Sequence, residues 1–163
     1  MFFIPKTSNL EIKKRLDKTI LILSSDSGSS YLKSDGTPLD KISGEMAMLL
    51  VQQNTTLTPI EAEEITSSKK GSEYRGRTLP LMKVISKNEK DKLINVYLNV
   101  YSGEVTAIRS MQWKIWDLMW GFHIMDWQER DNIDNLFLKI FSILALVSSI
   151  SGILLFFKID FKK

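Results

Sequence analysis

The residue best suited to bind a metal ion or a haem group is the single histidine, His123. Met119 precedes it by about one helical turn, and Asp126 follows it by nearly one turn. Imidazole, thioether and carboxylate groups are all metal ligands. The alternative is a histidine at a membrane edge that hydrogen-bonds to a carboxylate or a backbone carbonyl group. One histidine makes a poor metal site alone, so ligation would need a second ligand from a homodimer or another protein.

Other kinds of chemistry have little support in the composition. The chain has no cysteine, which excludes disulfides, thiolate metal sites and cysteine nucleophiles. It also has no phosphate-binding loop of the form GxxxxGK. A net charge of +3, with acidic and basic residues evenly mixed, argues against binding to nucleic acid. The sequence therefore predicts a protein that is not an enzyme and that has no confidently assigned metal or cofactor.

His123 belongs to an aromatic segment, residues 111–127, that contains all four tryptophans of the chain. Spacings of three, four and seven residues place the tryptophans on one helical face together with His123. Tryptophan favours the membrane–water interface, where its ring is buried and its N–H group stays hydrated. We therefore expect an interfacial helix, or an extension of a membrane helix. The tryptophans are Trp113, Trp116, Trp120 and Trp127.

A hydrophobic helix is expected over roughly Leu136 to Phe157. About 22 residues at 1.5 Å each extend for about 33 Å, enough to cross a hydrocarbon core of about 30 Å. The uncharged run over residues 140–157 would need a far larger soluble protein to cover it. Small residues four positions apart allow a second helix to approach closely, and the pairs are Ala145 with Ser149 and Ser148 with Gly152.

The charges on either side of this helix predict its orientation. Lys158, Lys162 and Lys163 follow it, whereas acidic residues predominate over residues 126–134 before it. The positive-inside tendency then places the C-terminus in the cytoplasm and the N-terminal part outside it, in a bacterial inner membrane. Translocation normally requires an N-terminal signal or membrane helix, and residues 1–6 show neither.

The first 110 residues predict a small α+β domain. We expect a hairpin over residues 19–33, with a turn at 26–28, and a helix over 42–53. Thr58, Pro59 and Glu61 have the features of a capped helix start, so a second helix is expected to run to about residue 68. The closely spaced glutamates after Pro59 are interpreted as a solvated helix face rather than as acid–base catalysts.

Three further strands are expected over residues 79–86, 94–101 and 104–108, and they would form an antiparallel sheet against the second helix. Alternation along the middle strand places Tyr97 and Tyr101 on the face opposite its apolar residues. These tyrosines and the exposed strand edges are candidate surfaces for a partner. The alternative is that the tyrosines pack against the sheet.

The expected organisation has six parts. They are an N-terminal segment 1–18, a hairpin plus helix 19–56, a helix and antiparallel sheet 57–110, an interfacial segment 111–134, a transmembrane helix 135–158 and a basic tail 159–163.

Two stretches of the chain resemble a known family. The order T-P-x-E-A at 58–62, followed by V-Y-L-N-V-Y-S-G-E-V at 96–105, resembles a PepSY domain. The segment W-K-I-W-D-x-x-W-x-x-H-I-M-D at 113–126, with R-D-N at 130–132 and Ser151-Gly152 in the helix, is similar to the PepSY-associated membrane helix. The resemblance covers about residues 19–157. Relatives generally begin with a membrane helix, and this chain starts after the place where that helix would be.

The resemblance implies a module outside the cytoplasm that inhibits or regulates a peptidase. It favours a membrane-anchored, non-enzymatic protein that binds a membrane protein, a peptide, a peptidase or a second copy of itself, with the lipid bilayer as a further contact. The alternative is a haem- or metal-linked accessory of an iron-uptake or electron-transfer system, in which His123 is the ligand, because larger relatives are linked to iron–siderophore reduction.

Overall fold

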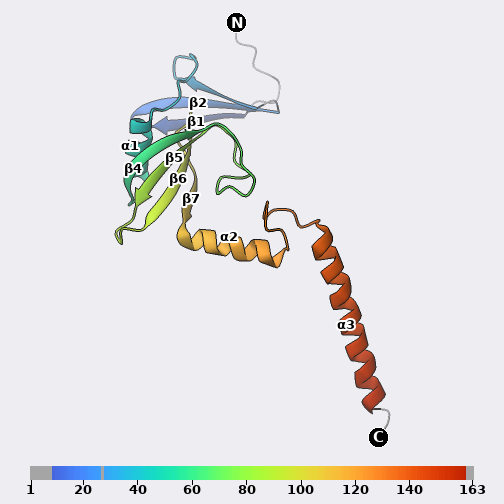
Figure 1. Ribbon diagram of the computed structural model, residues 1–163. Coiled ribbons are helices and arrows are strands. Elements are labelled where there is room, and N and C mark those ends of the chain that lie inside the picture. The colour runs from blue at the N-terminus through green and yellow to red at the C-terminus, as the bar shows by residue number, and fades with distance from the viewer. Residues whose placement is uncertain (1–8, 27, 161–163) are drawn as a thin grey trace. The chain divides into compact units, whose positions relative to one another are not determined.

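The computed structural model describes residues 9–26 and 28–160. The chain divides into two compact units, Met1–Met111 and Gln112–Lys163, and each is described by itself. The expected N-terminal segment up to residue 8 lies outside the described residues, as do Ser27 of the first turn and Lys162 and Lys163 of the basic tail. The first unit contains two antiparallel sheets and one helix, which confirms an α+β domain (Figure 1).

The first sheet has three strands in the order β1-β2-β3. The strands are β1 (Asn9–Arg15), β2 (Lys18–Ser25) and β3 (Gly28–Lys33). β2 and β3 form the expected hairpin, and Ile20, Ile22 and Leu39 make a small core beneath it. β1 was not expected from the sequence. Its polar residues outnumber its apolar ones because it is an edge strand that remains largely exposed.

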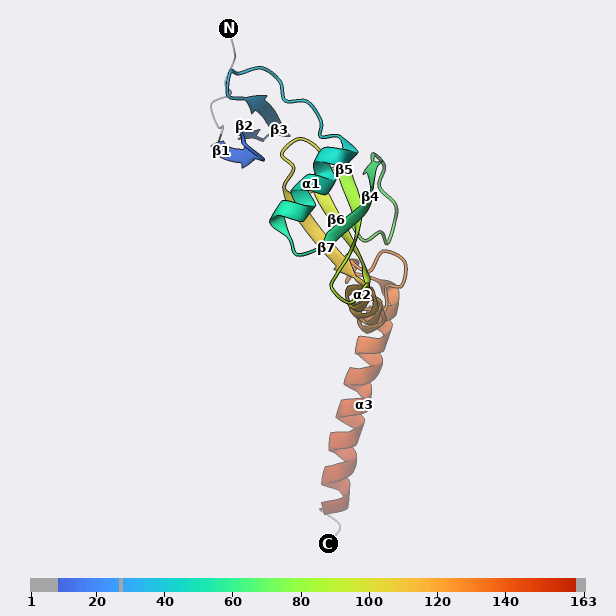
Figure 2. The ribbon, with the colours of Figure 1, turned by 90° about the vertical axis from the view of Figure 1, so that its left-hand side faces the viewer.

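The second sheet has four strands in the order β4-β5-β6-β7, and the helix α1 covers one face of it (Figure 2). The expected strands at 79–86, 94–101 and 104–108 are confirmed as β5, β6 and β7, and the helix expected at 42–53 is confirmed as α1. The elements are α1 (Gly44–Asn54), β4 (Thr58–Ile65), β5 (Leu81–Lys87), β6 (Leu93–Asn99) and β7 (Val105–Ser110).

The main core lies between α1 and this sheet. α1 starts at Ser43, whose Oγ accepts a hydrogen bond from the Met46 N–H group at 3.2 Å, so the hydroxyl satisfies a free donor at the helix start. Apolar residues at helical spacing on α1 meet alternate residues of β5 and β6. The buried members of this core are Ile42, Ala47, Leu50, Val51, Met82, Val84, Val96, Leu98 and Val100.

The helix expected over residues 58–68 is wrong, because this segment is the edge strand β4. Proline is tolerated at a sheet edge, and the register shifts between Pro59 and Glu61. The acidic side chains are not a helix face. Glu63 stands opposite Lys83 of β5 and accepts a hydrogen bond from it at 2.6 Å. Local capping signals predicted a helix, whereas pairing with β5 decided for a strand.

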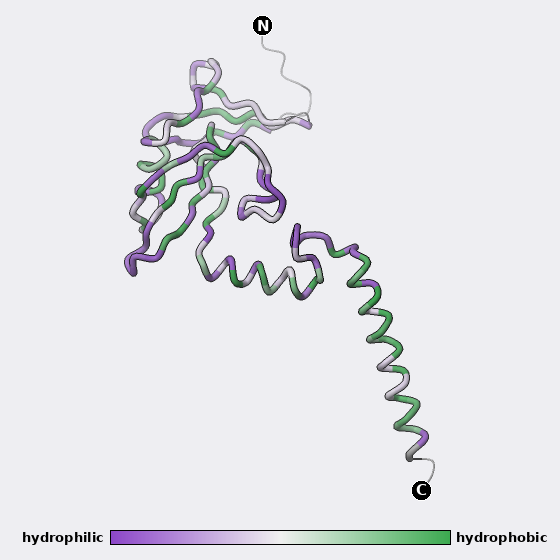
Figure 3. The backbone as a smooth tube through the Cα atoms, in the orientation of Figure 1, coloured by the Kyte–Doolittle hydropathy of each residue, from purple (hydrophilic) through white to green (hydrophobic). Residues whose placement is uncertain are grey.

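The second unit contains α2 (Met111–His123) and α3 (Leu136–Asp160). Within the described residues, one helix, Leu136–Lys158, is long and apolar enough to cross a membrane, and none of its most apolar stretch is buried. Figure 3 shows this nearly unbroken hydrophobic stretch. The expected membrane-spanning helix is therefore supported by length and composition. α2 confirms a helix in the aromatic segment, but it ends at His123, so Trp127 does not share its face.

Candidate functional site

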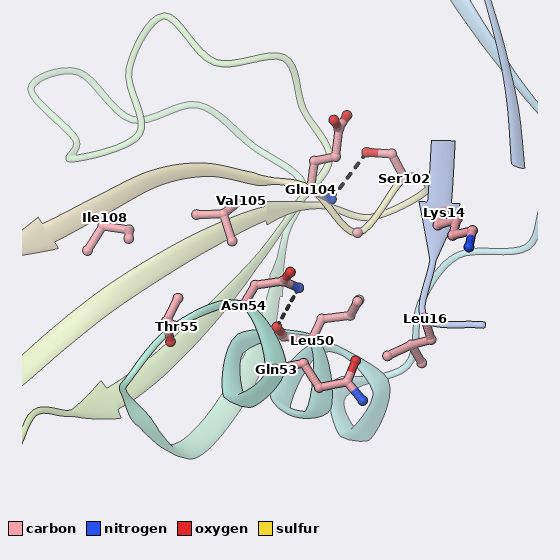
Figure 4. A pocket seen from close by; sticks show the side chains of 11 residues that line it. Lys14, Leu16, Leu50, Gln53, Asn54, Thr55, Ser102, Glu104, Val105 and Ile108 are labelled. Carbon is pink, nitrogen blue, oxygen red and sulfur yellow. Dashed lines mark hydrogen bonds between the residues drawn. The ribbon is translucent and has the colours of Figure 1, made fainter. Parts of the chain in front are cut away.

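An open groove of about 430 Å³ lies beside the edge strand β7 of the first unit (Figure 4). It lies between the end of α1, the turn after β1 and the strand β7. Its lining residues are Lys14, Leu16, Leu50, Gln53, Asn54, Thr55, Ser102, Gly103, Glu104, Val105 and Ile108. We refer to these residues as the β7 groove.

The apolar floor of the β7 groove comes from the edge strand. Val105 pairs with Leu98 and Ile108 pairs with Val96, so both face the same side of the sheet as the core residues. α1 packs mainly on β4 and β5 and therefore leaves this part of the sheet open. Ile108 is 45% exposed, which is unusual for an isoleucine on the core side of a sheet.

The position of the turn beside β7 is set by Arg15 and Gly103. Arg15 donates hydrogen bonds to the carbonyl oxygens of Asp40 and Tyr101, at 2.9 and 2.8 Å, and so ties the β1–β2 hairpin to the end of β6. Gly103 has φ 73°, and a Cβ there would lie 2.6 Å from Leu50 Cδ1. The positive φ favours a glycine at this turn, because an L side chain there would be strained and Leu50 would have to shift.

Some polar side chains of the β7 groove are already hydrogen-bonded within the protein, and others could bond to a ligand. Asn54 and Thr55 donate to carbonyl oxygens of α1 and finish that helix. Glu104 accepts a hydrogen bond from Lys13 at 2.6 Å, and its hydrogen bond, with that of Glu11, raises the pKa of Lys13. The side chains of Lys14 and Gln53 make no hydrogen bond or ion pair within the described residues. The groove thus offers an ammonium and an amide to a ligand.

The residues expected to ligate a metal are not assembled into a metal site. His123 and Met119 are exposed, and the His123 ring lies 6.0 Å from that of Trp120. In the part of the chain that the structure describes, no group of three or more His, Cys, Asp or Glu residues could hold a metal ion. Asp126 is already engaged by the backbone that follows it. Ligation by His123 stays a prediction that would need ligands from another chain.

Asp126 accepts hydrogen bonds from four backbone N–H groups, at 3.0 to 3.3 Å. The donors are those of Gln128, Glu129, Asp131 and Asn132. Burial by itself would raise the pKa of Asp126, but these four donors together hold the pKa below its ordinary value. The carboxylate therefore organises the loop between α2 and α3.

The same loop is held by a buried ion pair and an asparagine cap. Arg130 donates to Asp117 at 2.7 Å, and the Asp117 side chain is only 1% exposed. Asn135 donates to the carbonyl oxygens of Ile124 and Asn132, and its own oxygen accepts from the N–H of Leu138 in the first turn of α3. We call residues 117–138 the elbow. Most polar residues of the pre-membrane motif act inside it.

The tryptophans are largely exposed within this unit. Trp116 and Trp120 stack on α2 with ring centroids 6.0 Å apart. Trp127 lies beyond the helix, where its ring contacts those of Phe122 and Phe137 at 6.2 and 6.1 Å. Trp113 is half-buried. Exposed aromatic rings next to a membrane-length helix are what an interfacial segment requires, but the membrane contact itself stays a prediction.

The two tyrosines that were expected to form a partner surface differ in their burial and contacts. Tyr97 is 2% exposed and donates to Glu73 at 3.1 Å, and burial, together with Glu73, raises its pKa. A partner surface at Tyr97 is therefore wrong, because the segment after β4 covers this face and the tyrosine packs against Tyr74. Tyr101 is half-buried, stacks on Tyr31 at 5.2 Å and lines a second hollow of about 440 Å³, so its role as a contact stays a prediction.

The small residues of α3 are exposed. Ser149 donates to the carbonyl oxygen of Ala145 at 2.8 Å, so its hydroxyl donor is satisfied within the helix. Ser148 and Gly152 lie one turn apart, and nothing lies within 4 Å of a Cβ built at Gly152. Their role in packing against a second helix is a prediction.

We compared the chain with protein-family models, with curated proteins and with solved structures, and none of them matches it.

Proposed function

We propose that this chain is a membrane-anchored, non-enzymatic binding module of PepSY type, and that its β7 groove receives an extended segment of a partner protein or peptide. The single observation that carries the proposal is the edge strand β7, which borders an open groove with an exposed apolar floor. An extended peptide adds to such an edge through main-chain hydrogen bonds, and its alternate side chains enter the neighbouring pocket.

The lining of the groove suggests the chemistry of the partner segment. Val105 and Ile108 suit an apolar side chain that faces α1. Lys14 suits a carboxylate, either of an acidic side chain or of a chain terminus. A partner segment would therefore combine an apolar residue with a nearby negative charge. Regulation of a peptidase is one role that such binding could serve.

The family assignment rests on part of the original resemblance. The stretch V-Y-L-N-V-Y-S-G-E-V forms β6, its turn and the start of β7, in agreement with the strand hairpin that the family implies. T-P-x-E-A lies on β4, not on a helix, and this part of the resemblance counts against the assignment. A helix on an antiparallel sheet is nevertheless present, supplied by α1.

The anchor and its orientation complete the proposal. α3 would span the bacterial inner membrane, with α2 and its exposed tryptophans in the interface. The first unit would lie outside the cytoplasm, since Lys158 lies in the last turn of α3 and acidic residues precede the helix.

The test compares two exposed isoleucines at opposite edges of one sheet. Ile108 lies on β7 in the groove, and Ile60 lies on β4 with a similar exposure of 49%. The full chain is purified from gently solubilised membranes, and its stoichiometric partners are identified. Ile108→Asp is expected to lose the partner, whereas Ile60→Asp is expected to keep it. Equal loss in both variants, or no partner for the unaltered chain, would contradict the proposal.

A second candidate function follows from the exposure of His123 next to an aromatic ring. Here the chain would be a haem- or metal-linked accessory of an iron-uptake or electron-transfer system. Protein purified in detergent would then show a Soret band, or bound iron or copper by elemental analysis, and His123→Ala would lose it. A spectrum without that band and a metal-free analysis would remove this candidate.

A further inference from the structure

We propose that two copies of this chain associate through β1, which pairs with β1 of the second copy in an antiparallel register centred on Ile12. The two three-stranded sheets would then form one continuous sheet of six strands. The interface lies on β1 and shares only Lys14 with the β7 groove; the apolar floor of the groove on β7 takes no part in it. It does not depend on the proposed partner binding.

The exposure of the first sheet increases toward this edge. One face of the sheet is apolar on all three strands, and its residues on β2 and β3, namely Leu21, Leu23 and Leu32, are half-buried. On the edge strand, Leu10 is 57% and Ile12 is 67% exposed. Aliphatic residues that become exposed only at an edge are suited to meet a further strand, which would cover them.

The main chain of β1 is suitable for pairing. Arg15 and Lys18 flank a two-residue turn. A hairpin of this length is closed by a hydrogen-bonded pair, and such pairs alternate along an antiparallel ladder. The backbone groups of Leu10, Ile12 and Lys14 are therefore expected to face away from β2. A register centred on Ile12 pairs these same three residues across the new interface.

Charge complementarity selects this register. Centred on Ile12, the pairing places Glu11 opposite Lys13 of the second copy, and it does so twice because of the two-fold symmetry. Centring on Glu11 would oppose two glutamates, and centring on Lys13 would oppose two lysines. Like charges directly opposite one another destabilise a sheet. Of the registers centred on residues 11 to 13, the one centred on Ile12 alone avoids like charges directly opposite one another.

The other edge strands argue for β1 as the paired edge. β4 contains Pro59 and a register shift, and β7 has a register shift between Tyr97 and Leu98 of its neighbour β6. Such irregularities disfavour continuous pairing of two whole sheets along a full strand, although a short peptide can still pair with the regular part of β7. β1 pairs with β2 without interruption from Asn9 to Arg15 and has no proline. β3, the other edge of this sheet, is also regular, but Pro38 bridges to it at Leu32. β1 is therefore the edge best suited to accept an identical strand.

The absence of cysteine from the chain allows a direct test by cross-linking. Opposed residues in an antiparallel pair have Cα atoms about 4.5 to 5.5 Å apart, within the range of a disulfide. Full-length Ile12→Cys protein in detergent is expected to form a covalent dimer under mild oxidation in at least half of the chains. Ile60→Cys, on the exposed edge β4, is the matched control and is expected to form no covalent dimer.

The register is tested by a mixture of two variants. Glu11→Cys and Lys13→Cys are expected to cross-link to each other at least fivefold more than either does to itself. Light scattering should give a dimeric mass for the unaltered chain, and Glu11→Lys should shift it toward the monomer. A monomeric mass, or a dimer in which Ile12→Cys does not cross-link, would overturn the proposal; the second result would point to pairing through α3. Ile108→Asp should leave the cross-link unchanged, whatever it does to partner binding.

Discussion

Asp117 is the most deeply buried charged side chain of the elbow, and its ion pair with Arg130 joins α2 to the loop before α3. A carboxylate that is removed from such a pair leaves the guanidinium without its charge partner in a site with little water. The aspartates at 117 and 126 are thus expected to stabilise the elbow in different ways, one through an ion pair and one through backbone N–H groups.

Asp117→Asn is expected to destabilise the elbow by about 3 kcal/mol, at the lower end for a buried pair because Arg130 remains 27% exposed. Trypsin cleavage after Arg130 in the full-length protein would then be at least tenfold faster. The control is Asp134→Asn, whose pair with Lys139 is exposed and contributes at most about 1 kcal/mol. Equal cleavage rates in the two variants would contradict the role given to Asp117.

The lowered pKa of Asp126 predicts that the elbow loses stability in acid. Its folded pKa is lowered, so its stabilising effect is present above the ordinary aspartate pKa of about 3.9 and is lost as pH falls through the lower folded value. The carboxyl ¹³C resonance of Asp126 in micelles should titrate with a midpoint below 3.9. A midpoint above 3.9 would mean that burial outweighs the four N–H donors.

The elbow leaves little space for a side chain at Gly121. A Cβ at this position would lie 2.9 Å from the Asp126 carbonyl oxygen and 3.0 Å from Arg130 Cγ. Gly121→Ala is therefore expected to cost about 1–3 kcal/mol and to speed cleavage after Arg130. Gly152→Ala, where nothing lies within 4 Å, should leave cleavage unchanged. Faster cleavage in Gly152→Ala would show that the assay reports a general effect of added methyl groups.

At the scale of elements, α3 is defined by composition, whereas β4 is defined by its neighbour. The apolar stretch of α3 has no burial to explain it within the structure, so lipid is the solvent that suits it. β4 has the capping signals of a helix start, but it forms a strand because β5 provides a ladder and Lys83 pairs with Glu63. The length of an apolar run can be recognised in consecutive residues, whereas the pairing of a strand depends on residues that are distant in the sequence.

Val147 lies near the middle of the apolar helix and provides the test of the anchor. Val147→Lys is expected to weaken membrane insertion by about 3 kcal/mol, the cost of an ammonium group at the centre of a bilayer helix. Val147→Ala is the control. The measurement is the fraction of the full chain that stays in the membrane pellet after alkaline extraction. Equal retention of both variants would argue that α3 is not inserted.

At the scale of the whole molecule, the question is on which side of the membrane the first unit lies. Single cysteines can be placed at Leu93, which is 59% exposed on β6, and at Lys158 in the last turn of α3. A maleimide that does not cross membranes is expected to label Leu93→Cys in intact cells and Lys158→Cys only after permeabilisation. The reverse pattern would place the first unit in the cytoplasm.

Local sequence determined the elements whose signal lies within a few consecutive residues. The uncharged run defined α3, period-two alternation defined β6, and helical spacing defined α1. Tertiary structure decided what depends on distant partners. It made β4 a strand, buried Tyr97 against Tyr74, and moved Trp127 off the helix of the other tryptophans. It also formed the β7 groove, because Lys14, Gln53 and Ile108 meet only when the β1–β2 hairpin, α1 and β7 have folded together.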